Sequence, residues 1–96
     1  MQFEWDEDKN LANIGKHGVS FEQAMRIFDA PTFDREDDRT DYGEKRTTWL
    51  GLLEGIVLLS VTHTDREGRI RMISARPAAR KERAIYLGAI QQAARR

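Results

Sequence analysis

The sequence predicts an α+β domain in which an antiparallel sheet of about three or four strands is covered by two N-terminal helices and one C-terminal helix. Apolar residues recur at helical spacing through residues 7–29 and again after residue 77, whereas between residues 45 and 76 they alternate with polar residues, as in strands. A chain of 96 residues supports one hydrophobic core, so residues 1–96 are expected to form a single domain.

The N-terminal third carries signals for a short strand and two helices. After the first apolar segment, Asp6 suits the N-cap of a helix and Gly18 its left-handed C-terminal cap. Ser20 and Gln23 have the spacing of a capping box at the start of a second helix, which Pro31 ends. The polar residues that follow indicate a short edge strand leading into an exposed acidic loop.

A strand meander and a closing helix are predicted for the rest of the chain. The strands cover residues 45–53, 56–63 and 69–76. A tight turn at Gly55 joins the first two, and a loop over residues 64–68 joins the last two. Pro77 suits the first position of the helix, because its missing N–H would be unpaired there. The helix is expected to run to about Ala94 and to pack through Ala79, Tyr86, Ile90 and Ala93.

Charge is distributed unevenly, although the formal net charge is zero. Residues 1–44 hold 12 acidic and 5 basic side chains, and residues 45–96 hold 4 acidic and 11 basic ones. This asymmetry favours a polyanion as partner of the basic half. No cysteine and only two histidines are present, so neither a metal site nor a cofactor is expected. With no signal-peptide pattern and no apolar run long enough to span a bilayer, we expect a cytoplasmic protein without a membrane partner.

Cations at the ends of the predicted strands are the first candidates for a functional site. If the strands are neighbours, Arg46 and the arginines of the third strand would meet at one end of the sheet beside His63. Strict alternation puts Arg69 and Arg71 on one face of that strand. It puts four other side chains on the opposite face: Ile70, Met72, Ser74 and Arg76.

The start of the closing helix carries further positive charge, on Arg80, Lys81 and Arg83. The helix dipole disfavours cations at this end, so local stability does not explain them. Several cations around a helix N-terminus are suited to binding phosphate.

Each candidate also has a purely structural interpretation. His63 can be a packed ring at the edge of the core. Each arginine can pair with an acidic side chain, since exposed ion pairs are common and weak. Lys16 and His17 lie at the end of the first predicted helix, where the dipole favours cations.

The sequence resembles the BrnT toxins of bacterial type II toxin–antitoxin modules, which are related in fold to the RelE ribonucleases. The resemblance lies in FEWDEDKNLANIGKHGVSFEQAMRIFD (residues 3–29), GEKRTTWLG (43–51) and VTHTDREGRIRMISARPAARKERAIY (61–86). It implies a RelE-like fold and a metal-independent endoribonuclease that inhibits translation and growth. It also implies a BrnA-like antitoxin with a ribbon-helix-helix domain, which blocks the toxin and, by contacting DNA itself, represses their shared operon.

The resemblance also implies a set of site residues. The family's pattern falls on Lys16, His17, Arg46, His63, Arg71, Ser74, Arg76, Arg83 and Tyr86. Our hypothesis is that His63, or Lys16 with His17, supplies acid–base catalysis. Arg46, Arg71 and Arg76 would hold the scissile phosphate and stabilise its developing charge. Four residues would add to RNA or phosphate binding: Ser74, Arg80, Arg83 and Tyr86.

The main alternative is a non-catalytic subunit, such as a co-repressor, that uses the same cationic face to dock an acidic partner segment or nucleic acid. Binding alone requires charge but no proton transfer. His63→Ala should therefore matter little for a binding subunit, whereas it should abolish cleavage by an enzyme that depends on this histidine.

Overall fold

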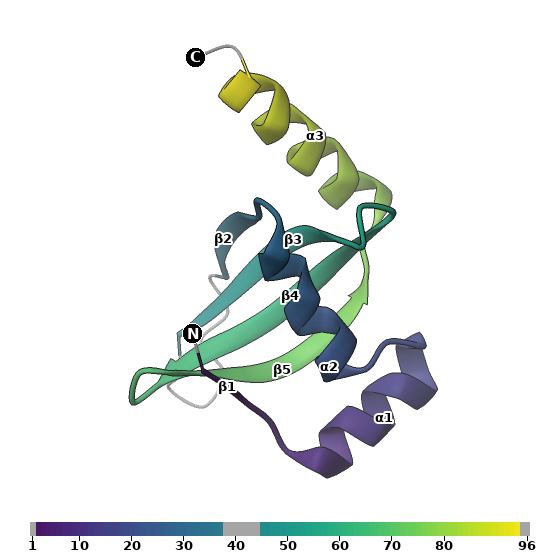
Figure 1. The fold of residues 1–96 in the computed structure, drawn as a ribbon, viewed down its shortest axis with the longest axis vertical. Coiled ribbons are helices and arrows are strands. Elements are labelled where there is room, and N and C mark those ends of the chain that lie inside the picture. The colour runs from purple at the N-terminus through teal and green to yellow at the C-terminus, as the bar shows by residue number, and fades with distance from the viewer. Residues whose placement is uncertain (1, 38–44, 95–96) are drawn as a thin grey trace.

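The computed structural model describes residues 2–37 and 45–94, which form three α-helices and a five-stranded sheet (Figure 1). The elements in chain order are β1 (Phe3–Glu4), α1 (Glu7–His17), α2 (Phe21–Ala24), the 3-10 helix η1 (Met25–Asp29), β2 (Phe33–Asp37), β3 (Arg46–Leu53), β4 (Val57–Arg66), β5 (Arg69–Pro77) and α3 (Arg80–Ala94). The strand order is β1-β5-β4-β3-β2. β1 runs parallel to β5, and the other neighbours are antiparallel. The predicted α+β class is confirmed.

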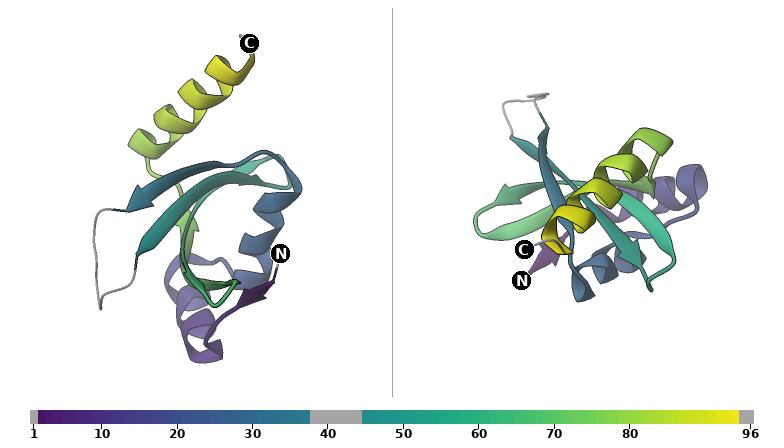
Figure 2. Two further views of the ribbon diagram at one scale, coloured as in Figure 1. Left: turned by 90° about the vertical axis from the view of Figure 1, so that its left-hand side faces the viewer. Right: turned by 90° about the horizontal axis from the view of Figure 1, so that it is seen from above.

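Hydrophobic side chains pack on both faces of the sheet. On one face, α2 and η1 contribute Phe21 and Ile27 to a cluster that includes Leu59 and Val61 of β4. α1 contacts β5 beside this cluster. On the other face, Tyr86 of α3 packs with Leu50 and other apolar residues of a smaller cluster. Beyond this contact α3 projects away from the sheet, as Figure 1 and the left view of Figure 2 show.

Local sequence signals fix the ends of the first elements as predicted. The Asp6 side chain accepts hydrogen bonds from the first-turn N–H groups of α1, and Gly18 ends the helix with a φ of 74°. Ser20 and Gln23 form the capping box of α2. Gly55 has a φ of 72° in the turn between β3 and β4, a conformation that glycine adopts without strain.

The boundaries of β4, β5 and α3 differ from the prediction. β4 continues to Arg66, so only Glu67 and Gly68 form the turn to β5, both with positive φ. Pro77 does not begin the closing helix but ends β5, opposite Leu59. α3 begins at Arg80 instead.

The predicted packing of α3 is confirmed only in its first half. Tyr86 is 7% exposed, but Ile90 is 40% exposed, and Ala79 and Ala93 are exposed as well. The acidic loop expected after β2 falls mainly on residues 38–44, outside the described residues. No helix in the described ranges is long and apolar enough to cross a bilayer.

Candidate functional site

A cationic pocket lies at the end of the sheet where β3 and β5 begin and β4 ends. Its lining consists of Lys9, Arg46, Thr64, Arg66, Arg71, Met72 and Ile73, around a cavity of about 260 Å³. Of the strand arginines predicted to meet at one end of the sheet, Arg46 and Arg71 come together here, whereas Arg76 lies toward the other end of β5. Lys9 from α1 and Arg66 from β4 join them, although the sequence pattern did not single them out. Four cations around one small cavity suit a phosphate group.

Arg71 is held at the pocket by the edge strand β1. Backbone pairing places Glu4 beside Arg71, and the Glu4 carboxylate lies 2.8 Å from Nη1 of Arg71. Arg69 lies farther away, with 3.9 Å between its Nη1 and the same carboxylate. The Arg71 side chain is 27% exposed, so it remains accessible from solvent while Glu4 restricts its motion. The guanidinium has five N–H donors, which leaves donors of Arg71 for a phosphate.

A β-bulge interrupts β5 next to this pocket. In the pairing of β4 with β5, Thr62 is opposite Ser74 whereas His63 is opposite Met72. One step along β4 thus corresponds to two along β5, and Ile73 is the extra residue. The bulge shifts the alternation of side chains along β5 by one position.

Because of the bulge, Arg71 shares a face with Ser74 and Arg76. Strict alternation had placed Arg71 on the other face from these two residues, so that prediction is wrong. The antiparallel register puts all three on the face of Thr62 and Thr64. We call this surface, which runs from the cationic pocket to Arg76, the polar face of the sheet.

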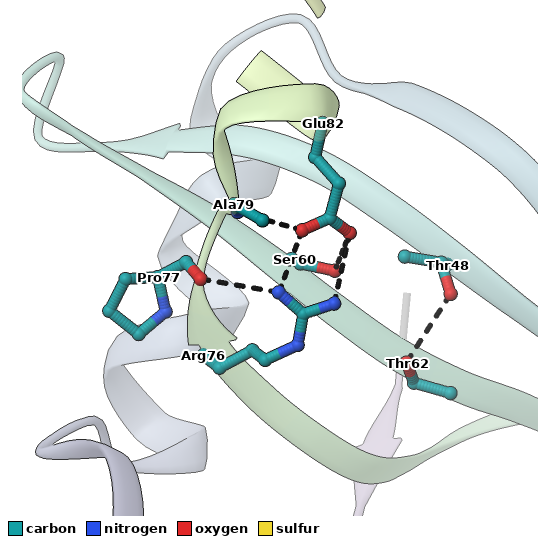
Figure 3. Close-up of polar contacts among 7 residues, drawn as sticks. All are labelled: Thr48, Ser60, Thr62, Arg76, Pro77, Ala79 and Glu82. Carbon is teal, nitrogen blue, oxygen red and sulfur yellow. Dashed lines mark hydrogen bonds and ion pairs between the residues drawn. The ribbon is translucent and has the colours of Figure 1, made fainter. Parts of the chain in front are cut away.

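Hydroxyl groups occupy the polar face between the pocket and Arg76. Oγ1 of Thr48 and Oγ1 of Thr62 lie 3.3 Å apart, within hydrogen-bond distance across β3 and β4 (Figure 3). Ser74 is opposite Thr62 on β5. The Thr64 hydroxyl donates to the backbone carbonyl of Lys45 over 2.9 Å, which ties the end of β4 to the segment preceding β3. These groups offer hydrogen bonds to a polar ligand lying along the face.

Arg76 and Glu82 form a bidentate ion pair at the other end of the polar face (Figure 3). Nη1 of Arg76 lies 2.7 Å from Oε1 of Glu82, and Nη2 lies 3.1 Å from Oε2. The carboxylate also accepts from the Ser60 hydroxyl at 3.0 Å and from the backbone N–H of Ala79 at 2.8 Å. Desolvation by burial raises the pKa of Glu82, but hydrogen bonds from Arg76, Ala79 and Ser60 outweigh it and hold the pKa below its ordinary value.

The ion pair leaves one edge of the Arg76 guanidinium available. Nη1 also donates to the carbonyl of Pro77 at 3.3 Å. The edge formed by Nε and the second N–H of Nη2 has no protein acceptor among the described residues, and in Figure 3 it is turned away from Glu82. Arg76 can therefore bind a phosphate oxygen while Glu82 holds it in place. Glu82 was missed as a functional residue, although its spacing from Ala79 is that of the acidic partner in a capping box.

His63 lies on the opposite face of the sheet, stacked on Trp49 with ring centroids 3.4 Å apart. It is 5% exposed, and its Nδ1 has no hydrogen-bond partner among the described residues. Burial lowers the pKa of His63 from 6.5 to about 4, although the Val61 backbone and the charges of Asp34 and Asp65 act in the other direction. The imidazole is therefore uncharged at neutral pH.

The predicted meeting of His63 with the strand arginines is wrong. Thr47 is opposite His63, so the alternation along β3 puts Arg46 on the other face. Thr64 is the connection between the two regions, because it lines both the cationic pocket and a second pocket beside His63. The remaining lining residues of this second pocket are Asp34, Lys45, Thr47, Trp49 and Asp65.

Lys16 and His17 occupy the last turn of α1, outside the lining of the cationic pocket. Asn13 fixes this part of α1 on β5 through hydrogen bonds in both directions with the backbone of Ala75, at 2.7 and 3.2 Å. Lys9 and Lys16 are separated by about 10 Å along the helix axis, at about 1.5 Å per residue. The two ends of α1 thus serve different regions of the sheet.

The residues predicted for RNA binding on α3 differ in accessibility. Arg80 and Arg83 are exposed in the first turn. Tyr86 is buried and packs with Leu50 and Leu58, so its position is that of a core residue.

Comparisons with known proteins agree with these observations. Residues 5–82 match the family described as "Ribonuclease toxin, BrnT, of type II toxin-antitoxin system". The crystal structure of the Brucella abortus ribonuclease toxin BrnT is similar, with a TM-score of 0.64 and 26% sequence identity. The similarity covers 83% of this chain and 99% of the Brucella chain. No curated protein sequence matches. The family match spans most of the chain, and the chain therefore belongs to the BrnT family of ribonuclease toxins from type II toxin–antitoxin systems.

Proposed function

We propose that this ribonuclease toxin is a metal-independent endoribonuclease that binds single-stranded RNA along the polar face of the sheet. The observation that carries the proposal is the cationic pocket at one end of this face, with Arg76 at the other end. The pocket presents cations rather than carboxylates to the ligand, which suits direct binding of phosphate.

The proposed reaction is an internal transesterification of RNA. The 2′-oxygen attacks the adjacent phosphorus, the bond from phosphorus to the 5′-oxygen breaks, and the products are a 2′,3′-cyclic phosphate and a 5′-hydroxyl. A base takes the proton from the 2′-hydroxyl, and an acid gives a proton to the departing 5′-oxygen. The phosphorane between these steps carries extra negative charge, which fixed cations stabilise.

Arg46 and Arg71 are proposed to hold the scissile phosphate, with Arg76 as a further phosphate contact. Arginine stays protonated throughout, so its contribution is electrostatic rather than proton transfer. The candidates for proton transfer are still His63, or Lys16 together with His17. With a pKa of about 4, His63 is unprotonated at neutral pH, so it can act there only as a base, and a weaker one than an ordinary histidine. It could act on RNA that reaches the second pocket past Thr64.

The biological context is part of the proposal. As a type II toxin, the chain has a cognate antitoxin. We propose that this antitoxin is BrnA-like, with a ribbon-helix-helix domain through which the complex binds its operon, and that the toxin acts in the cytoplasm by cutting RNA needed for translation.

The test is cleavage of a 5′-labelled RNA by the purified protein in EDTA. Wild type should leave a 2′,3′-cyclic phosphate, and Arg71→Ala should reduce the rate by at least 100-fold. Arg26→Ala is the matched control, because Arg26 also forms an arginine–carboxylate ion pair, with Glu54 at 3.0 Å, but lies outside the cationic pocket. Circular dichroism checks the fold of each variant. RNA affinity should also fall steeply with salt.

One structural observation favours the non-catalytic alternative. His63 is buried, uncharged at neutral pH and on the face away from the strand arginines. If wild type binds RNA but never cleaves it, the polar face is a docking surface only. If wild type cleaves RNA and a folded His63→Ala variant cleaves it equally well, His63 has only a structural role. Catalysis would then depend on the strand arginines and not on this histidine.

A further inference from the structure

The second half of α3 is a helical surface that the described chain leaves uncovered. Leu87 is 53% exposed and Ile90 is 40% exposed, and they are spaced i, i+3 on one side of the helix. From Leu87 to Ala94, Ala89 is the only residue that is not exposed. Figure 1 and the left view of Figure 2 show this part of α3 standing clear of the sheet.

The sheet supports only the base of α3. Glu82 connects it to Arg76 and Ser60, and Tyr86 packs in the smaller core cluster. Helices shorter than about 12 residues are marginal in water unless an apolar face is packed. The family match ends at residue 82, so the uncovered part of α3 lies beyond the residues that match the family. A partner that covers this surface would supply the missing packing.

The charge of α3 indicates what kind of partner fits. Arg80, Lys81 and Arg83 are exposed in its first turn, while its one acidic residue, Glu82, is engaged by Arg76. Residues 83–96 contain no acidic side chain, and the sequence ends in two further arginines. Two copies of α3 packed together would bring like charges into contact, which disfavours self-association. An acidic partner would be attracted instead.

We propose that α3 is a docking element for the antitoxin, which would lay an acidic amphipathic helix on it. Leu87 and Ile90 would be the apolar anchors, and the cations of the first turn would pair with acidic residues at one end of the partner helix. The inference rests on the assignment of the chain to a toxin family, and it specifies which surface and which partner chemistry are used. RNA is a poorer fit for the anchors, because it would leave the two aliphatic side chains without an apolar contact.

Docking here would also bring the antitoxin to the RNA-binding region. Leu87 follows Glu82 by about one and a half helical turns, or about 7 Å along the axis. Glu82 in turn contacts Arg76 at the end of the polar face. A partner anchored on α3 could therefore extend over the polar face and exclude RNA from it.

The experiment measures binding of the antitoxin encoded beside this toxin, by isothermal titration calorimetry without RNA. Leu87→Gln/Ile90→Gln should weaken the affinity at least tenfold, because both anchors become polar while glutamine preserves the helix. Lys81→Glu should weaken it further at low salt. The matched control is Leu11→Gln/Ile14→Gln on α1, an i, i+3 pair with similar exposure of 60% and 41%. The control pair should leave the affinity within twofold of wild type.

The outcomes separate this proposal from the ribonuclease proposal, because no cleavage is needed for the readout. Equal affinity of wild type and the α3 variant overturns the docking proposal, whether or not the protein cleaves RNA. So does a loss of antitoxin affinity confined to the α1 variant, which would move the interface to α1. Circular dichroism at the same concentration confirms that the variants retain their helices.

Discussion

Replacing Glu82 with glutamine should loosen the attachment of α3 to the sheet. The carboxylate accepts four hydrogen bonds, two from Arg76 and one each from Ser60 and Ala79. Glutamine keeps one acceptor oxygen, loses the charge and turns an N–H₂ group toward a donor. The Arg76 side chain is 41% exposed, so solvent screens the ion pair and its share is about 1 kcal/mol. Loss of the acceptor of the buried Ser60 hydroxyl lowers the stability by about 1 kcal/mol more.

The free energy of unfolding should therefore fall by about 2 kcal/mol at pH 7. For a domain of this size the midpoint of urea denaturation should drop by roughly 1.5 M. Tryptophan fluorescence and far-UV circular dichroism would both report it. Glu54→Gln is the matched control, because Glu54 also pairs with an arginine but is 65% exposed. Its effect should stay within about 0.5 kcal/mol.

The loss of stability caused by Glu82→Gln should also depend on pH and become smaller in acid. The pKa of Glu82 lies below its ordinary value of 4.5 in the folded protein, so the ionised carboxylate stabilises the fold fully above that value. The contribution is lost as pH falls through the lowered pKa, because the carboxylate then becomes protonated. The gap in stability between wild type and Glu82→Gln should thus narrow as the pH falls below 4.5. Equal midpoints at pH 7, or a gap that widens as the pH falls below 4.5, would refute the role assigned to this carboxylate.

Two further stability predictions follow from buried polar groups. The pKa of His63 is about 4 in the folded chain and 6.5 when unfolded, so stability is full above pH 6.5 and falls by up to about 3 kcal/mol as pH decreases to 4. His63→Gln should remove this dependence in urea titrations, and an unchanged slope would contradict the buried neutral imidazole. Asn13→Ala should cost about 3 kcal/mol in thermal unfolding, because it leaves the backbone N–H and C=O of Ala75 without their partner. A loss below about 1 kcal/mol would show that water replaces these bonds.

The parts of the fold that were predictable are those set by a few adjacent residues. Asp6 and Gly18 delimit α1, and Ser20 with Gln23 starts α2, because caps depend on side chains within one helical turn of the backbone they satisfy. The turn at Gly55 is local for the same reason. Pro77 shows the limit of such signals, since its fixed φ suits either the end of β5 or the start of a helix.

The arrangement of the site depends on pairing between strands, which local signals do not determine. The alternation within each strand was predicted correctly for His63 and for Arg46. Their placement on opposite faces follows from the register that sets Thr47 against His63. The bulge at Ile73 has no local sequence signal either, and it decides which face Arg71 occupies.

The pairing of β1 with β5 has a consequence for the synthesis of this toxin. Glu4 is synthesised before its partner Arg71, which lies 67 positions later in the chain. Arg71, Met72 and Ile73 also form part of the cationic pocket, so an unfinished chain that lacks β5 has no such pocket. Long-range contacts of this kind close late in folding, because the intervening chain must first be ordered. The nascent toxin is thus unable to assemble its cationic pocket on the ribosome until its last strand has been released.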